Sequence, residues 1–113
     1  MKYIQGKEKE WEHNPGYEKK VLREWNQWNK IQEIVIPPHE TAKLHYHTIQ
    51  TEIFYFLTEN GYRIVNGEKI IPVVWDVLII EPNDKHTVVN ETDDEYRYLA
   101  FKVDYVDDDL YRE

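Results

Sequence analysis

The chain has 113 residues, no cysteine and a formal net charge of −8 at pH 7. This length fits one domain with a modest core, and the lack of cysteine excludes disulfide bonds and thiolate metal ligands. The acidic charge disfavours nucleic acid as a partner, because a phosphate backbone would be repelled.

The two ends of the chain differ from its middle. The N-terminus lacks a secretion signal and no apolar run approaches the ~18 residues of a membrane span, so we expect a cytoplasmic protein without membrane contact. Residues 1–30 are predicted to form an arm and a first strand, starting near Tyr17, that packs on the main domain. Residues 31–106 hold that domain. Residues 107–113 are predicted to be a solvated acidic tail, because three aspartates begin it.

Short strands separated by Pro, Gly and Asn are expected through the main domain, and no segment shows sustained helical periodicity. The strand 31–36 ends at two prolines, and the strand 41–47 follows. Alternation on this second strand places Thr41, Lys43, His45 and His47 on one face, with Ala42, Leu44 and Tyr46 on the other. Lys43 is thus expected to face the same cavity as the histidines, where it either binds an anionic group, phosphate or carboxylate, or extends to the rim.

A metal site is predicted around these histidines. His45 and His47 have Cα atoms ~6.7 Å apart on one strand face, close enough for both rings to bind one ion. The segment 48–51 must turn, which brings Glu52 to the mouth of the next strand. His86, which follows a turn at 81–84, adds a third imidazole. This set of nitrogen and oxygen donors suits divalent Mn, Fe, Ni or Zn and leaves room for water or substrate.

The strand 52–57 is apolar on both faces. Phe54 and Phe56 share a face with Glu52, so they are expected to line the cavity as substrate-binding residues. The other face needs a cover outside the barrel, and a second subunit is the simplest one, which predicts a homodimer.

Four further strands are predicted towards the C-terminus. Asn66-Gly67 between two apolar runs predicts a hairpin over 62–71 with a type I′ turn. Strands are also expected over 77–80 and 96–103. Asn90 is expected to hydrogen-bond at a strand end rather than to bind metal.

The spacing of the metal-binding residues resembles two motifs of the cupin superfamily. The first motif is HxH, a short gap and Glu, matched by His45, His47 and Glu52. The second is matched in spacing by Trp75-(x)5-Glu81-Pro82-Asn83-(x)2-His86-(x)3-Asn90, in which Trp75 and Asn83 replace glycines and Glu81 replaces proline. The resemblance implies a double-stranded β-helix, the jelly-roll barrel of cupins, with one cupin domain in residues 31–106 and these three histidines and the glutamate as metal ligands.

A more distant similarity links the chain to small cupins resembling mannose-6-phosphate isomerase, through Asn14-Pro15-Gly16-Tyr17-Glu18 and Leu44-His45-Tyr46-His47. Serine and cysteine are both absent, so the metal is the evident source of reactivity. The hypothesis is metal-assisted isomerisation of a small sugar phosphate or carboxylate. Two alternatives remain open, a metal-dependent oxygenase of a small organic substrate and a non-catalytic protein that binds metal and a ligand.

Overall fold

The computed structural model describes residues 1–26 and 28–112, without the side chain of Trp25. These residues form one short 3-10 helix and eleven strands: η1 (Gly6–Glu8), β1 (Glu12–Asn14), β2 (Tyr17–Asn26), β3 (Asn29–Ile36), β4 (Thr41–Tyr46), β5 (Thr51–Phe56), β6 (Tyr62–Val65), β7 (Glu68–Ile70), β8 (Val77–Ile80), β9 (His86–Val89), β10 (Tyr96–Val103) and β11 (Tyr111–Arg112). No helix in this part of the chain is long and apolar enough to cross a membrane.

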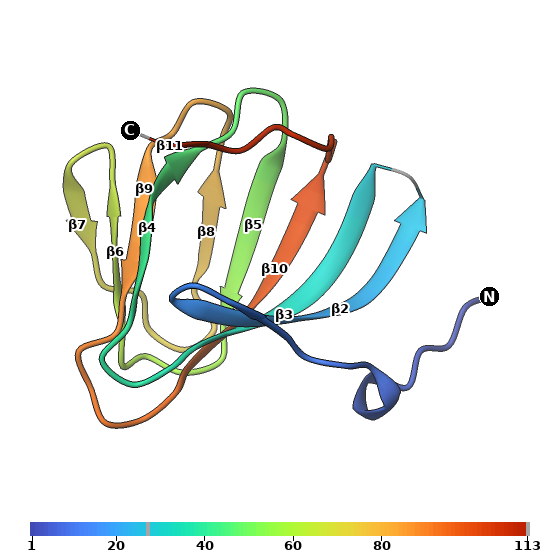
Figure 1. The fold of residues 1–113 in the computed structure, drawn as a ribbon, viewed down its shortest axis with the longest axis horizontal. Helices are drawn as coiled ribbons and strands as arrows, with labels where there is room; N and C mark the ends of the chain where they lie inside the picture. Colours follow the sequence, from blue (N-terminus) through green and yellow to red (C-terminus); the bar gives the residue numbers. More distant parts are fainter. Residues whose placement is uncertain (27, 113) are drawn as a thin grey trace.

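The strands form two antiparallel sheets that make the walls of a jelly-roll barrel (Figure 1). One sheet has the order β1-β2-β3-β10-β5-β8 and the other the order β11-β4-β9-β6-β7. This architecture confirms the predicted all-β, double-stranded β-helix. The division expected near residues 30 and 106 stays a prediction.

Several predicted elements are confirmed. The strands β8 and β10 have the predicted bounds, and β6 and β7 form the predicted hairpin. Asn66 and Gly67 have φ angles of 50° and 84°, as a type I′ turn requires. Asn90 is buried, and its side-chain amide donates to the carbonyl oxygens of Ile36 and Pro37 at a strand end, as expected.

The strict alternation predicted for β4 is wrong. Along β9 the pairing moves two residues, from Val88 to His86, while along β4 it moves three, from Ala42 to His45. This extra residue forms a β-bulge, which reverses the sheet face to which the earlier side chains of β4 point. Ala42 is therefore buried in the core, although alternation placed it on the outer face.

The acidic tail is also not wholly solvated. Asp107 and Asp108 are exposed as predicted, but Asp109 is only 5% exposed. Its carboxylate accepts hydrogen bonds from the backbone N–H groups of Thr48, Ile49 and Gln50. The prediction failed because the segment after β10 crosses the top of the barrel to pair with β4, and one carboxylate of the tail then satisfies the turn between β4 and β5 (Figure 1).

The two residues that replace motif glycines keep the backbone conformation of glycine. Trp75 has φ 78° and Asn83 has φ 72°. Asn tolerates this left-handed region, whereas a side chain such as Trp raises the energy by roughly 1–2 kcal/mol. Trp75 is 74% exposed, so no packing within the chain offsets that strain.

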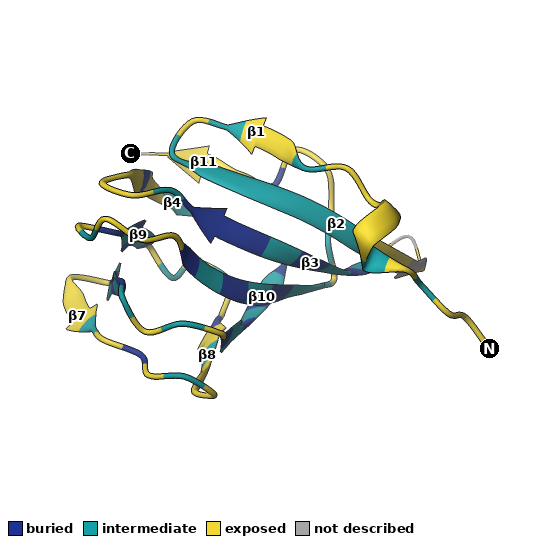
Figure 2. Cartoon of the chain, turned by 90° about the horizontal axis from the view of Figure 1, so that it is seen from below, coloured by how far each residue is buried: buried dark blue, intermediate teal, exposed yellow. Residues whose placement is uncertain are grey.

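The interior is arranged in rows of paired residues that run across the larger sheet. The first row is Lys30, Lys102 and Glu52, the second is Gln32, Ala100 and Phe54, and the third is Ile34, Tyr98 and Phe56. The smaller sheet faces them with His45, His86 and Val65 in its first row and Ala42, Val88 and Arg63 in its second. Buried residues concentrate on β3 and β10 (Figure 2). The inner face is thus polar near the histidines and apolar at the opposite end.

Candidate metal centre

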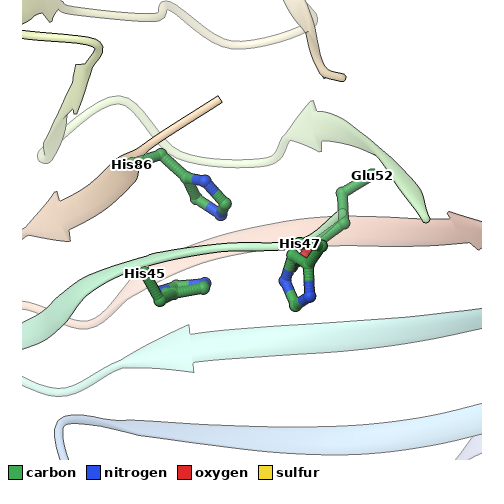
Figure 3. Close-up of side chains that lie close together, drawn as sticks. All are labelled: His45, His47, Glu52 and His86. Atoms are coloured by element: carbon green, nitrogen blue, oxygen red, sulfur yellow. Dashed lines mark ion pairs between the residues drawn. The ribbon is translucent and has the colours of Figure 1, made fainter. Parts of the chain in front are cut away.

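Four side chains from three strands and one turn converge at the polar end of the barrel (Figure 3). His45 lies on β4, His47 directly after it, Glu52 on β5 and His86 at the start of β9. One ligand atom from each of the four lies within 4.8 Å of the others. The cluster predicted from sequence spacing is therefore assembled in space.

Each imidazole is held by its Nδ1 atom. The Nδ1 atoms lie 2.7 Å from the Lys43 carbonyl oxygen for His45, 2.7 Å from the Asp109 carbonyl oxygen for His47 and 2.9 Å from the Asp84 carbonyl oxygen for His86. A carbonyl only accepts, so each Nδ1 carries the proton and each Nε2 carries a lone pair. Metal-binding histidines are oriented in this way, with the second nitrogen fixed by a backbone or carboxylate oxygen.

The free nitrogens fit a cation. The Nε2 atoms of His47 and His86 are buried and have no hydrogen-bond partner among the described residues. His47 Nε2 lies 2.7 Å from Glu52 Oε1, without the alignment of a hydrogen bond. Two acceptors held this close, beside two further imidazoles, need a positive charge between them. The donor set of three nitrogens and one carboxylate suits a divalent transition metal or zinc.

Burial keeps His45 and His86 neutral. Desolvation lowers the pKa of His45 to about 4, and the neighbouring His86, whose ring centroid is 4.2 Å away, pushes it in the same direction. Burial also lowers the pKa of His86. Neutral imidazoles are the form that binds metal, so the site is ready for a cation at neutral pH.

The carboxylate stays charged despite its burial. Burial alone would raise the pKa of Glu52, but the contact with His47 and the positive charge of Lys102 outweigh it and hold the pKa below its ordinary value. Burial in turn lowers the pKa of Lys102, an effect that the charge of Glu52 opposes. The site therefore presents a negative oxygen beside neutral nitrogens.

The cluster lies in a cavity of about 470 Å³ between the two sheets. Five of its lining residues are cationic: Lys19, Lys43, Lys102, Arg63 and Arg112. Three are acidic, Glu52, Asp108 and Asp109. Glu52 faces the metal position and Asp109 is held by the turn before β5, so the charge available to a ligand is positive, in a protein whose net charge is −8.

The proposed substrate-binding residues lie in three different places. Lys43 lines the cavity from the bulge in β4 and is exposed. Phe54 lines the cavity wall. Phe56 has no exposed surface and does not line the cavity, but stacks on Tyr96 in the core.

The sequence interpretation missed several polar residues of the cavity, among them Gln32, Arg63, Lys102 and Asp109. In strands that alternate polar and apolar residues, the polar ones usually face solvent. Such strands hold Arg63, Lys102 and Gln32. The alternation of inward and outward side chains along a strand could have identified Arg63. Arg63 lies two residues before Val65, and an inward-facing Val65 places it inside.

The profile of the family described as Cupin domain matches residues 32–102. The chain belongs to the cupin superfamily. No curated protein matches the sequence of this cupin. Its narrower similarity to mannose-6-phosphate isomerase stays a prediction.

Solved structures share the fold at low sequence identity. KdgF from Halomonas sp. superimposes with a TM-score of 0.82 at 16% identity, covering 96% of this chain and 97% of its own. A predicted oxalate decarboxylase from Thermotoga maritima gives 0.81 at 20% identity, covering 92% and 100%. The polyketide cyclase RemF from Streptomyces resistomycificus gives 0.83 at 16% identity, covering 99% and 84%. Similarity at this level shows a shared fold, so the chemistry must be argued from the site.

The lowered pKa of His45 predicts a pH-dependent stability. Between pH 6.5 and about 4 the unfolded chain binds a proton at this position and the folded chain does not, so stability is lost as pH falls through this window. In metal-free protein, His45→Gln should reduce that loss by about 3 kcal/mol. Urea unfolding with a chelator present, at a series of pH values, measures it. The exposed-loop control His39→Gln should follow the wild-type curve, and equal losses in wild type and His45→Gln would contradict the assignment.

Proposed function

We propose that this cupin is a metal-dependent enzyme that binds a small anionic organic molecule and rearranges it by proton transfer. The observation that carries the proposal is the convergence of three oriented imidazoles and Glu52 in a cavity whose other charged side chains are mainly cationic. A divalent ion held by His45, His47, Glu52 and His86 would polarise a substrate carbonyl. A sugar phosphate or a carboxylate meets the charge requirement.

The chain's own residues supply binding and proton transfer. Lys43 at the rim attracts the anionic group, and Phe54 offers an apolar wall to the carbon skeleton. Lys102 lines the cavity and pairs across the strands with Glu52, which places an amine beside the carboxylate. We assign to Lys102 the movement of a proton between neighbouring substrate carbons, a role open to a lysine positioned within reach of the reacting atoms.

Oxygenase chemistry is the second candidate, favoured by the aromatic wall of Phe54 and Tyr98 next to the site. The names of the similar structures, a polyketide cyclase and a predicted oxalate decarboxylase, differ too much to select one reaction. The two candidates differ in the metal that they need. Carbonyl polarisation works with an ion that keeps one oxidation state. Oxygen chemistry needs an ion that can change its oxidation state.

Solvent deuterium distinguishes these possibilities. We expect the zinc-loaded protein in D2O to incorporate deuterium next to the carbonyl of a member of a panel of sugar phosphates and oxo- or hydroxycarboxylates, read by NMR. Lys102→Met should lower the exchange rate at least about 100-fold with metal content unchanged, because removal of a general base commonly loses 10²–10⁴-fold. The matched control Lys19→Met removes another amine of the cavity wall and should keep most of the exchange.

Metal-dependent oxygen uptake with the iron-loaded protein, in the absence of any exchange, would replace this proposal with the oxygenase. If neither reaction occurs and ligands still bind, the protein is a non-catalytic binding module.

We also propose that the protein is a homodimer. The patch that supports it, called the β8 patch, consists of Leu57, Val73, Trp75, Val77 and Ile79, all at least 38% exposed. Two of these residues lie on β8 at the edge of the larger sheet, two precede that strand, and Leu57 follows the neighbouring strand β5. The strained backbone of Trp75 places its ring in this patch. Packing of the ring on a second copy would account for the strain.

Light scattering after size exclusion tests the dimer. We expect twice the chain mass of 13.8 kDa for the wild type and the chain mass for the double variant Val77→Glu/Ile79→Glu, because charges in an apolar interface remain unpaired. The control Tyr3→Glu introduces a charge of the same sign at an exposed residue of the N-terminal arm and should remain dimeric. A monomeric wild type would contradict the proposal.

A further inference from the structure

Arg63 is the most unusual side chain of the cavity. It lies in the middle of β6, is 2% exposed and lines the cavity. It pairs with Val88, two residues along β9 from His86. Arg63 therefore belongs to the row below the metal-binding histidines, ~6.7 Å farther from the mouth.

Aromatic rings surround its guanidinium group. The Cζ atom lies 4.2 Å from the ring centroid of Phe54, 4.4 Å from that of Tyr98 and 5.6 Å from that of Phe56. Its Nε and Nη1 atoms are buried without a hydrogen-bond partner, and no acidic residue pairs with it among residues 1–26 and 28–112. The guanidinium is thus a buried cation that rests on rings and has donors to spare.

The rings alone do not account for such a burial. Cation–π contacts stabilise a desolvated cation by less than the burial of an unpaired ion costs. The nearest acidic row holds Glu52, which is in contact with His47. Desolvation raises the pKa of Tyr98 to about 12, so its hydroxyl is neutral and supplies no negative charge. An anionic group of a ligand in the cavity would supply the missing charge.

We propose that Arg63 binds a carboxylate group of the substrate, one row below the metal site. This inference deepens the proposed function and rests on it, since the same molecule would present an oxygen to the metal. The guanidinium edge matches the two oxygens of a carboxylate. Phosphate fits less well, because the row is closed below by Ile34, Tyr98 and Phe56, and a dianion there would have a single cation beside it.

A second orphaned group narrows the ligand class. Gln32 is 2% exposed and lines the cavity. It lies in the same row of paired residues as Phe54, whose ring Arg63 contacts. Its Oε1 atom is buried without a hydrogen-bond donor. A hydroxyl group on the ligand would supply that donor. The cavity therefore suits a small hydroxycarboxylate.

Calorimetric titration with succinate, malate and succinamide tests the assignment on the zinc-loaded protein. Succinamide has the shape of succinate without its charge, and malate adds one hydroxyl. We expect binding in the order malate, succinate, succinamide, with succinamide at least about tenfold weaker than succinate. Arg63→Met keeps the stem on the rings and should weaken succinate at least about tenfold, in line with loss of a charge-assisted pair of hydrogen bonds.

The control variant is Arg23→Met, which removes an exposed cation that does not line the cavity and should change affinity less than about threefold. If Arg63→Met does not fold, Arg63→Lys takes its place, because it keeps the charge and loses the planar fork. Equal succinate affinity in wild type and in the Arg63 variant would overturn the proposal, as would succinamide binding as well as succinate, or inorganic phosphate binding more tightly than both dicarboxylates.

The same titration in His45→Ala/His47→Ala separates this inference from the proposed function. Succinate binding that persists without metal and disappears on adding Arg63→Met supports the carboxylate site even if the enzyme proposal fails. Succinate binding that needs the metal and ignores Arg63 rejects the carboxylate site and leaves the metal proposal standing.

Discussion

The structure depends on an electrostatic constraint: lone pairs that converge in a buried site need a cation among them. Backbone carbonyls hold the Nδ1 atoms of His45, His47 and His86, so the rings cannot present N–H groups to Glu52 and to one another without changing tautomer. Bringing four acceptors together in this way opposes folding when no cation is present. Metal binding would reverse that cost, and would so couple the closure of the barrel's polar end to the ion.

The same constraint explains the fold around the site. The Asp109 carbonyl oxygen accepts from His47, and the Asp109 carboxylate accepts from the turn that leads to Glu52, so one residue of the C-terminal segment positions two of the four proposed ligands. The cations of the cavity complete the arrangement. They make the interior attractive to an anion in a protein that is acidic overall, which would direct a charged ligand to the proposed metal site rather than to the surface.

Local rules predicted the parts of the molecule that local chemistry decides. Asn66-Gly67 has one favourable turn, and the continuous apolar run of β8 has one favourable conformation. Alternation along one strand paired His45 with His47, and the match to the two cupin motifs added Glu52 and His86. Alternation failed at the β4 bulge, because the bulge depends on pairing with β9. Phe56 was wrongly assigned to the cavity because alternation gives the face of a residue and not its distance from the metal site. Asp109 and Arg63 were missed because their partners are distant in sequence.

Elemental analysis by plasma mass spectrometry, on protein purified without chelator or affinity tag, tests the central claim most directly. The account predicts near-stoichiometric divalent metal in the wild type and its loss in His45→Ala/His47→Ala, with no loss in the exposed-loop control His39→Ala. A wild type without metal after equilibration with Mn, Fe, Ni and Zn, or a double variant with as much metal as the wild type, would contradict it.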